Sequence, residues 1–177
     1  MRNLASRQCS AVVLTLFTSL PSWPRKSACS SFVWVTFRTE NNRNICRSPI
    51  GEAVFQDIIR KESLENKWEV HSAALIGYHT GKSPDHRAMS TLRDKGITNY
   101  SHKARPVNDF ETFDWIFGMD NENISHLNRM KPQGSKAKVE LLGKYDPQGE
   151  VIIRDPYYVA RCANKYSRSD ESRERCM

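Results

Sequence analysis

The amino-acid sequence predicts a doubly wound α/β fold, in which a four-stranded parallel sheet carries helices on both faces. Short apolar segments rich in β-branched and aromatic residues alternate with segments whose apolar residues recur at helical spacing. At 177 residues, the chain suits one domain with a sizeable core and is short for two. No apolar run reaches the roughly 18 to 20 residues that a bilayer span needs, so we expect no membrane partner.

The first half of the domain is expected to contain two strands separated by a helix. Residues 32–37 are typical of a buried strand, residues 38–43 of a polar loop, and residues 68–74 of a second strand. Ser48 is a good N-cap and Pro49 suits a first helical turn, so the helix is expected to start there. Its apolar face consists of Ile50, Ala53, Val54 and Ile58.

The second half continues this alternation. The elements expected are a helix from 83–85 to Gly96, a short strand at 97–102, a short helix at 108–113, a strand at 114–117, a helix at 121–130 and a last strand at 138–142. Ligands of such sheets bind outside the carboxyl ends of the strands. Two segments belong at that edge: the loop ending at residues 46–48 and the loop that carries Asp155.

The net charge of +7 first suggests an anionic macromolecular partner. Its distribution argues against one, because residues 44–158 have a net charge of 0, whereas residues 1–43 carry +5 and residues 159–177 carry +2. The excess therefore lies in the two flanks. Since no zinc-finger spacing or other nucleic-acid signature is present, we expect no nucleic-acid partner.

The cysteines are also concentrated in the flanks, and only Cys46 lies in the central region. An odd count of five without a regular framework does not indicate a disulfide scaffold. No paired-cysteine or cysteine–histidine pattern suggests a metal, and no cofactor is expected.

Residues 1–31 have a basic start, a moderately apolar run at 11–20 and small residues after it. Three interpretations are open: a secretory signal peptide, a mitochondrial transit peptide, or sequence foreign to the functional protein, such as an alternative or mistaken first exon. We favour the third interpretation, and with it a cytoplasmic location, because of the pattern in the loop discussed next. Residues 159–177 are polar without an apolar stripe and are expected to form a disordered tail.

The segment 44–49 (NICRSP) lies between an expected strand and an expected helix. Backbone N–H groups at such a turn, together with the start of a helix, favour an anion such as phosphate. Arg47 can bind two phosphoryl oxygens at once, which a lysine cannot do. An ordinary strand–helix turn with a surface arginine is the alternative.

The phosphate-site interpretation is supported by five segments that follow one another along the chain: NICRSPIGEAVF, GKSPDHRAMSTLRDKGI, SHKARPV, DFETFDWIFGMD and KAKVELLGKYDPQGEVIIRDPYY. They resemble the low-molecular-weight protein tyrosine phosphatases over residues 44–158, and NICRSP and DPYY are specific to that family. The resemblance implies a domain at 32–158, with a phosphate loop after the first strand. The substrates it implies are phosphotyrosine proteins or small aryl phosphates, with inorganic phosphate as product or inhibitor.

The family's mechanism, carried over by motif, assigns roles to individual residues. A cysteine of the C-x5-R loop attacks phosphorus, and an aspartate protonates the leaving group. The resemblance makes Asp155 this general acid, although an aspartate before Pro156 also favours a turn. It makes Arg47 the phosphate clamp and Ser48 the partner of the thiolate. The remaining implied residues are the loop and its supports (Asn44, Ile45, Cys46, Ser72, His102) and the walls of a slot for a phenolic ring (Tyr78, Tyr157, Tyr158).

The resemblance fails before Asn44. Asn41 stands six positions before Arg47, where the family has its nucleophilic cysteine, and Arg43 stands where the family has a glycine. Placing residues 33–37 in the first-strand position lengthens the loop but supplies no cysteine. We therefore expect a phosphatase-type chain that is strongly impaired, or a pseudophosphatase that binds phosphotyrosine or phosphate without hydrolysis. The related arsenate reductases need further redox cysteines, which the central region lacks.

The family also continues past DPYY into a long amphipathic helix, which residues 159–177 do not resemble. We expect an exposed apolar patch where that helix is missing. For Met119-Asp120, a role in the site and a role as a helix cap are both open.

Overall fold

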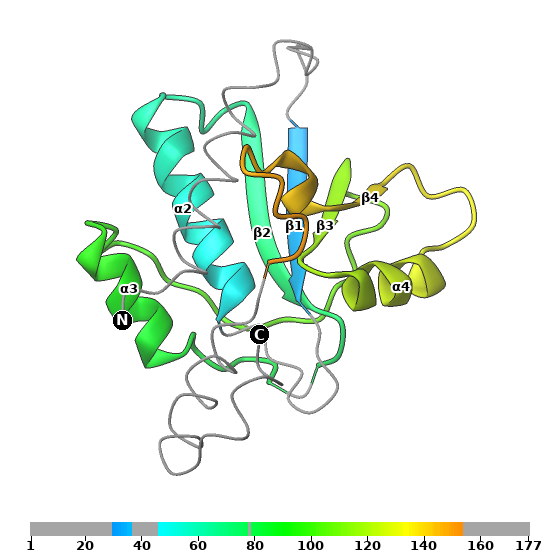
Figure 1. The fold of residues 1–177 in the computed structure, drawn as a ribbon, viewed down its shortest axis with the longest axis horizontal. Coiled ribbons are helices and arrows are strands. Elements are labelled where there is room, and N and C mark those ends of the chain that lie inside the picture. Colours follow the sequence, from blue (N-terminus) through cyan, green and yellow to red (C-terminus); the bar gives the residue numbers. More distant parts are fainter. Residues whose placement is uncertain (1–29, 37–45, 78, 154–177) are drawn as a thin grey trace.

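A computed structural model of the chain describes residues 30–36, 46–77 and 79–153. Its strands are β1 (Ser30–Thr36), β2 (Trp68–Ala74), β3 (Trp115–Gly118) and β4 (Lys138–Leu141). They form one sheet in the order β2-β1-β3-β4, and every pair is parallel (Figure 1). The predicted four-stranded parallel sheet is confirmed, and β1, which overlaps the strand expected at 32–37, lies between β2 and β3.

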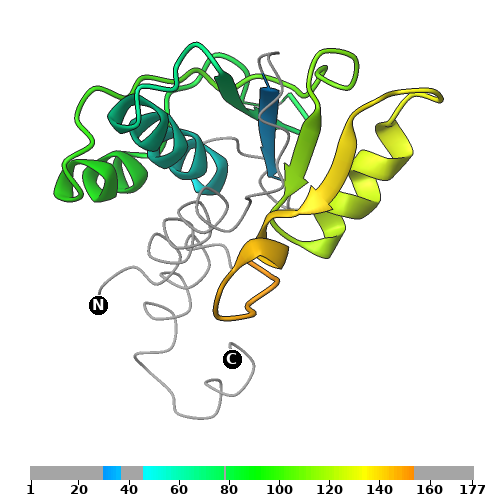
Figure 2. The same ribbon diagram turned by 90° about the horizontal axis from the view of Figure 1, so that it is seen from above.

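The described helices are α2 (Arg47–Lys61), α3 (His86–Asp94), α4 (Asn121–Met130) and the 3-10 turn η1 (Leu142–Tyr145). Figure 2 shows α2 and α3 on one side of the sheet and α4 on the other. Helices therefore cover both faces, as the alternating pattern of the sequence predicts.

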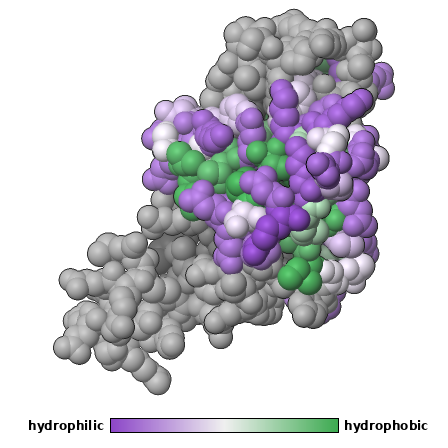
Figure 3. Space-filling model, turned by 90° about the vertical axis from the view of Figure 1, so that its right-hand side faces the viewer, coloured by the Kyte–Doolittle hydropathy of each residue, from purple (hydrophilic) through white to green (hydrophobic). Residues whose placement is uncertain are grey.

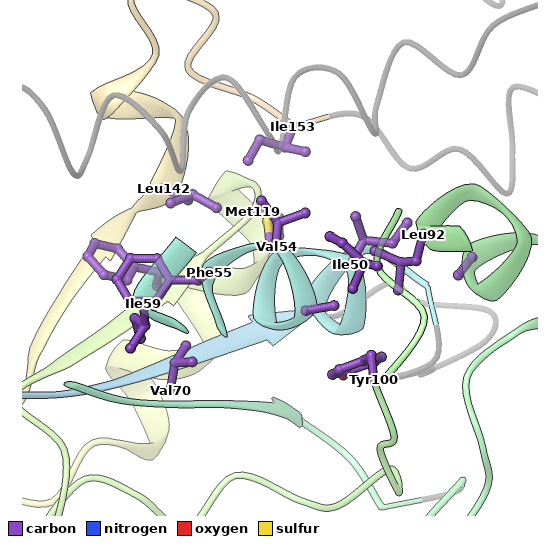
Figure 4. Packing of buried hydrophobic residues seen from close by; sticks show 14 of the residues in the cluster. Ile50, Val54, Phe55, Ile59, Val70, Leu92, Tyr100, Met119, Leu142 and Ile153 are labelled. Atoms are coloured by element: carbon purple, nitrogen blue, oxygen red, sulfur yellow. The ribbon is translucent and has the colours of Figure 1, made fainter. Parts of the chain in front are cut away.

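Residues of β3 show how the two faces are separated. Trp115 and Phe117 pack in a cluster with Phe55 of α2, whereas Ile116 packs in a second cluster with Leu127 of α4. Successive side chains of a strand point to opposite faces, so this alternation places one apolar core on each side of the sheet. Figure 4 shows the first cluster gathered around α2.

Helix α2 begins two residues earlier than its sequence suggests. Cys46 occupies the N-cap position, and Ser48, expected to cap the helix, lies inside it and is fully buried. Every residue from Arg47 to Phe55 is buried, so the first half of this helix is enclosed on all sides. The polar groups in that half consequently need partners within the protein.

The other two helices start at aspartate caps. The Asp85 carboxylate accepts a hydrogen bond from the N–H of Arg87 at 2.8 Å, and the chain leaves α3 at Gly96, where φ is +81°. The Asp120 carboxylate accepts a bond from the N–H of Asn123 at 2.9 Å and caps α4. The predicted starts of both helices are confirmed.

Two short elements predicted from the sequence are wrong. Residues 97–102 are not a strand; the pairing occurs later, where Pro106 forms an isolated parallel bridge with Ala74. Residues 108–113 are not a helix but a turn, closed by the bond from the N–H of Phe113 to the Asp109 carbonyl at 2.9 Å. Each segment has only two apolar or aromatic residues among polar ones, which is too few for periodicity to distinguish element types.

Figure 3 shows the face opposite α3 as mostly hydrophilic, with an apolar patch near its centre. Among the described residues, Val151 and Ile152 are 41% and 38% exposed just before the predicted tail. No described helix is long and apolar enough to cross a membrane. Residues 1–29, 37–45, 78 and 154–177, which include the expected leader and tail, lie outside the description.

Candidate active site

Arg47 opens α2 at the carboxyl edge of the sheet, where the sequence places a phosphate loop. Its side chain is only 4% exposed. Nη1 donates to the Ile153 carbonyl at 2.6 Å, and Nη2 donates to Asp120 Oδ2 at 3.0 Å. The two bonds use the planar, forked geometry of the guanidinium and fix the plane of the group.

Asp120 serves two elements at once. Oδ1 caps α4 through the N–H of Asn123, while Oδ2 pairs with Arg47. The neighbouring Met119 N–H donates to the Asn123 side chain at 2.9 Å. Asp120 is thus a cap and also a partner of Arg47, so it fills both of the roles that its sequence leaves open.

The segment before Asp155 is held against the same group. The N–H of Ile153 donates to the Met119 carbonyl at 2.9 Å, and its own carbonyl accepts from Arg47. Ile153 is fully buried. Since consecutive Cα atoms are about 3.8 Å apart, Asp155 follows within two residues of a backbone group that touches Arg47.

A second set of polar groups surrounds Glu52, which lies on α2 and is almost fully buried. Glu52 Oε2 accepts from the Ser72 hydroxyl at 2.6 Å and from the Tyr100 hydroxyl at 2.6 Å, and it lies 3.1 Å from His102 Nδ1. Ser72 Oγ also lies 3.4 Å from His102 Nε2. A proton on Nδ1 lets His102 donate to the carboxylate, which joins α2, β2 and the segment after α3.

The surroundings of Glu52 decide its charge. Burial alone raises the pKa of Glu52, but hydrogen bonds from His102, Ser72 and Tyr100 outweigh burial and bring the pKa below its ordinary value. Burial, and after it the charge of Glu52, raises the pKa of the Tyr100 hydroxyl far above its usual range. Glu52 is therefore a carboxylate and Tyr100 a neutral donor at neutral pH.

The described residues bring the predicted site residues together in two groups. Cys46, Arg47 and Ser48 form the start of α2, and Ser72 and His102 meet at Glu52. Cys46 is half-buried and packs against the first cluster. The other predicted site residues lie outside the described part of the chain: Asn41, Asn44, Ile45, Tyr78, Asp155, Tyr157 and Tyr158.

Sequence reasoning missed Glu52 and Tyr100 and left the role of Asp120 open. Glu52 is a charged residue within an apolar helical pattern, and a carboxylate on the inner face of a helix is a detectable signal of a buried partner. Tyr100 lies in a segment that was expected to be a strand. In the part of the chain that the structure describes, no group of three or more histidine, cysteine or carboxylate side chains could hold a metal ion.

The fold and the site together define a doubly wound α/β protein with a candidate anion site at the start of its first helix. The family described as low molecular weight phosphotyrosine protein phosphatase matches residues 41–169, nearly three quarters of the chain. The chain belongs to this family. The match begins at Asn41 rather than at residue 44 and continues past Tyr158, so its bounds are wider than the sequence motifs indicate.

Individual proteins similar to the chain support this assignment to the family. The low molecular weight phosphotyrosine protein phosphatase of Sus scrofa is 50% identical over 119 residues, covering 65% of this chain and 75% of its own length. The crystal structure of Primo-1 superposes with a TM-score of 0.64 at 41% identity, covering 73% of this chain and 82% of that one. A protein tyrosine phosphatase from Entamoeba histolytica, with Hepes in its active site, has a TM-score of 0.65 at 32% identity, covering 73% and 81%.

Proposed function

We propose that residues 32–158 form a phosphomonoester site of the protein tyrosine phosphatase type that binds its ligand but does not turn it over. Arg47 binds phosphoryl oxygens, Asp155 is the general acid, and the position of the nucleophile is occupied by Asn41. The ligands are phosphotyrosine proteins or small aryl phosphates. The proposal combines the family's function with the one position at which this chain departs from the family's chemistry.

The observation that carries this proposal is the environment of Arg47. A buried guanidinium whose plane is fixed by Asp120 and by the Ile153 carbonyl is pre-organised, so binding an anion costs little ordering. A guanidinium can bind two phosphoryl oxygens in a bidentate, charge-assisted contact, which is the role proposed for Arg47.

Asp155 is proposed to act together with Arg47 as the general acid of the site. It follows Ile153, whose carbonyl accepts from Arg47, so the acid and the clamp belong to adjoining segments. A general acid must reach the leaving oxygen while the arginine holds the phosphoryl group. Tyr157 and Tyr158, with Tyr78, are proposed to flank the aromatic ring of the ligand.

The chain as written lacks the covalent step, because the amide of Asn41 is not a nucleophile toward phosphate monoesters. Loss of the nucleophile in a covalent enzyme can cost roughly 10⁶ in turnover, which corresponds to about 8 kcal/mol of barrier. Arg43 adds bulk where a glycine lets a phosphate loop turn tightly. We expect p-nitrophenyl phosphate hydrolysis near the background rate.

The test compares three proteins in p-nitrophenyl phosphate hydrolysis at mildly acidic pH. They are the chain as written, Asn41→Cys/Arg43→Gly, and a chain whose first 43 residues are replaced by a family-type strand and loop. Turnover only in the repaired proteins is the expected result. Family-like turnover by the unmodified chain would refute the proposal and make Cys46 the next residue to mutate.

Binding without hydrolysis has its own test. Ligands that bind the folded state raise the melting temperature by mass action, so millimolar inorganic phosphate should raise that of the unmodified chain. Sodium chloride at the same ionic strength separates this effect from a general effect of salt. A melting temperature that phosphate leaves unchanged would rule out the binding function while leaving the family membership intact.

The proposal also covers the two flanking segments and the location of the protein in the cell. Residues 1–31 and 159–177 are proposed to add nothing to the site, the latter as a disordered tail, and the protein is placed in the cytoplasm. Terminal sequencing of the mature protein checks this, because a chain shortened near residue 30 indicates a secreted or organellar form.

A further inference from the structure

Tyr100 contributes a hydrogen bond to Glu52 that neither the family motifs nor the proposed catalytic scheme uses. The residue is buried, and its hydroxyl lies 2.6 Å from Glu52 Oε2. Its ring is stacked on the His102 ring with an interplanar angle of 3° and a centroid separation of 6.2 Å. Tyr100 thus touches the acceptor of the cluster and one of its other donors.

The position of Glu52 connects this cluster to the phosphate site. Glu52 follows Arg47 by five residues on α2, a rise of about 7.5 Å at the standard rise per residue. Its bond to Ser72 ties α2 to β2, and its contacts with Tyr100 and His102 tie α2 to the segment after α3. These bonds set the rotation of α2 about its axis and hence the direction of its first turn.

The balance of charge around Glu52 depends on these donors. A buried carboxylate that loses one of its short bonds is less well stabilised as an anion. The Tyr100 hydroxyl can donate a single proton, and in this structure that proton points to Glu52. Without it, the Glu52 carboxylate and the His102 ring have fewer constraints on their orientation.

We propose that Tyr100 is a positioning residue for the phosphate-binding site, acting through Glu52 and His102 on the first turn of α2. The inference rests on the proposed function, since it concerns the affinity of that site for phosphate. Loss of the Tyr100 hydroxyl lowers the fraction of molecules whose α2 start is correctly oriented, and apparent affinity falls by the same factor.

The experiment measures binding of inorganic phosphate to the full chain by calorimetry and by ³¹P NMR. Tyr100→Phe removes one oxygen and keeps the ring stacked on His102. We expect its Kd for phosphate to rise about 3- to 10-fold, because only part of the free energy of a hydrogen bond to a charged group reaches the binding site through α2. In ¹³C NMR of labelled glutamate, the Glu52 carboxyl should titrate at a higher pH in this variant.

Tyr145→Phe is a matched control. The Tyr145 hydroxyl also donates to a carboxylate, Glu140 Oε2, at 2.6 Å, and it lies outside the Glu52 cluster. This variant should keep the phosphate Kd within about twofold of the parent, since it removes the same kind of bond elsewhere. The Glu52 titration should also stay unchanged.

A double variant tests the route of the effect. If Tyr100 acts through Glu52, then Tyr100→Phe should change the Kd little further in a Glu52→Gln background. Equal phosphate binding by Tyr100→Phe and the parent overturns the inference and leaves the proposed function standing. Absence of phosphate binding by the parent itself overturns both. A Tyr100→Phe chain that does not fold by circular dichroism, while Tyr145→Phe does, overturns the positioning role in favour of a structural one.

Discussion

Arg47 Nη2 and Asp120 Oδ2 lie 3.0 Å apart although the two residues are 73 positions apart in the sequence. This ion pair links the start of α2 with the start of α4, which lie on opposite faces of the sheet. Arg47 is 4% exposed and Asp120 21% exposed, so the pair lies at the rim of the core rather than on the surface. Its partial burial makes the charge of Arg47 expensive to leave without a partner.

Asp120→Asn tests that ion pair while retaining the helix cap, because asparagine also caps well. The free energy of unfolding should fall by about 1 to 3 kcal/mol, the range for a buried group that loses a charged partner. Urea unfolding measures it. The control is Asp85→Asn, which alters the pairing of a cap with the more exposed Arg87 and should cost less than about 1 kcal/mol. Equal losses of unfolding free energy in the two variants would show that the ion pair of Asp120 with Arg47 contributes no more than that of Asp85 with Arg87.

Arg47→Lys should cost both stability and phosphate binding. A lysine cannot donate to the Ile153 carbonyl and to Asp120 in the forked geometry that Arg47 uses. We expect a loss of about 2 to 4 kcal/mol in the free energy of unfolding. Phosphate should no longer raise the melting temperature. A lysine variant that retains the full phosphate-dependent shift would show that the anion binds elsewhere.

Glu52→Gln should change how stability depends on pH. The folded-state pKa of Glu52 is lowered, so its ionised form contributes stability above the ordinary glutamate pKa, and this contribution is lost as the pH falls through the folded value. The parent should therefore exceed Glu52→Gln in stability by more at pH 6.5 than at pH 3.5. Urea unfolding at both pH values measures the difference. The exposed Glu65→Gln should change it by less than about 0.5 kcal/mol at either pH.

Gly143→Ala should loosen the segment that leads to Asp155. A Cβ at this position would lie 2.1 Å from the Val151 carbonyl oxygen, and a backbone atom cannot move aside alone. We expect a loss of about 2 to 4 kcal/mol in the free energy of unfolding, together with faster hydrogen exchange at the Ile153 amide. Gly77→Ala is the control, because its added Cβ meets only the Thr80 side chain, at 3.0 Å. A loss at Gly143→Ala no larger than that at Gly77→Ala would show that the backbone near Val151 moves to accommodate the added Cβ.

Much of the fold could be predicted because its elements have strong local signals. The strand predicted at 68–74 and the helix predicted at 121–130 have the same bounds as β2 and α4. Asp85 and Gly96 mark the start and the end of α3, as the sequence predicts. The errors at 97–102 and 108–113 arise where the chain packs as extended coil or as one turn. There, apolar content reflects burial in the core rather than regular backbone structure.

The site was predicted only in part for a different reason. Arg47, Ser72 and His102 could be named because they fall within motifs, but their partners could not. The contacts of Glu52 with Ser72, Tyr100 and His102 join residues 20, 48 and 50 positions away, and no spacing rule reports such distances. The role of Asp120 stayed open between cap and site because one carboxylate oxygen suffices for a cap. Its second oxygen serves a contact that only the tertiary structure reveals.

The central strand β1 pairs with both β2 and β3, yet its residues Ser30–Thr36 precede the family match, which begins at residue 41. A central parallel strand is recognised by its neighbours mainly through backbone hydrogen bonds, so many apolar, β-branched sequences can fill the position. The sheet is therefore completed by a strand from outside the family match, and backbone pairing preserves the scaffold where the sequence no longer follows the family.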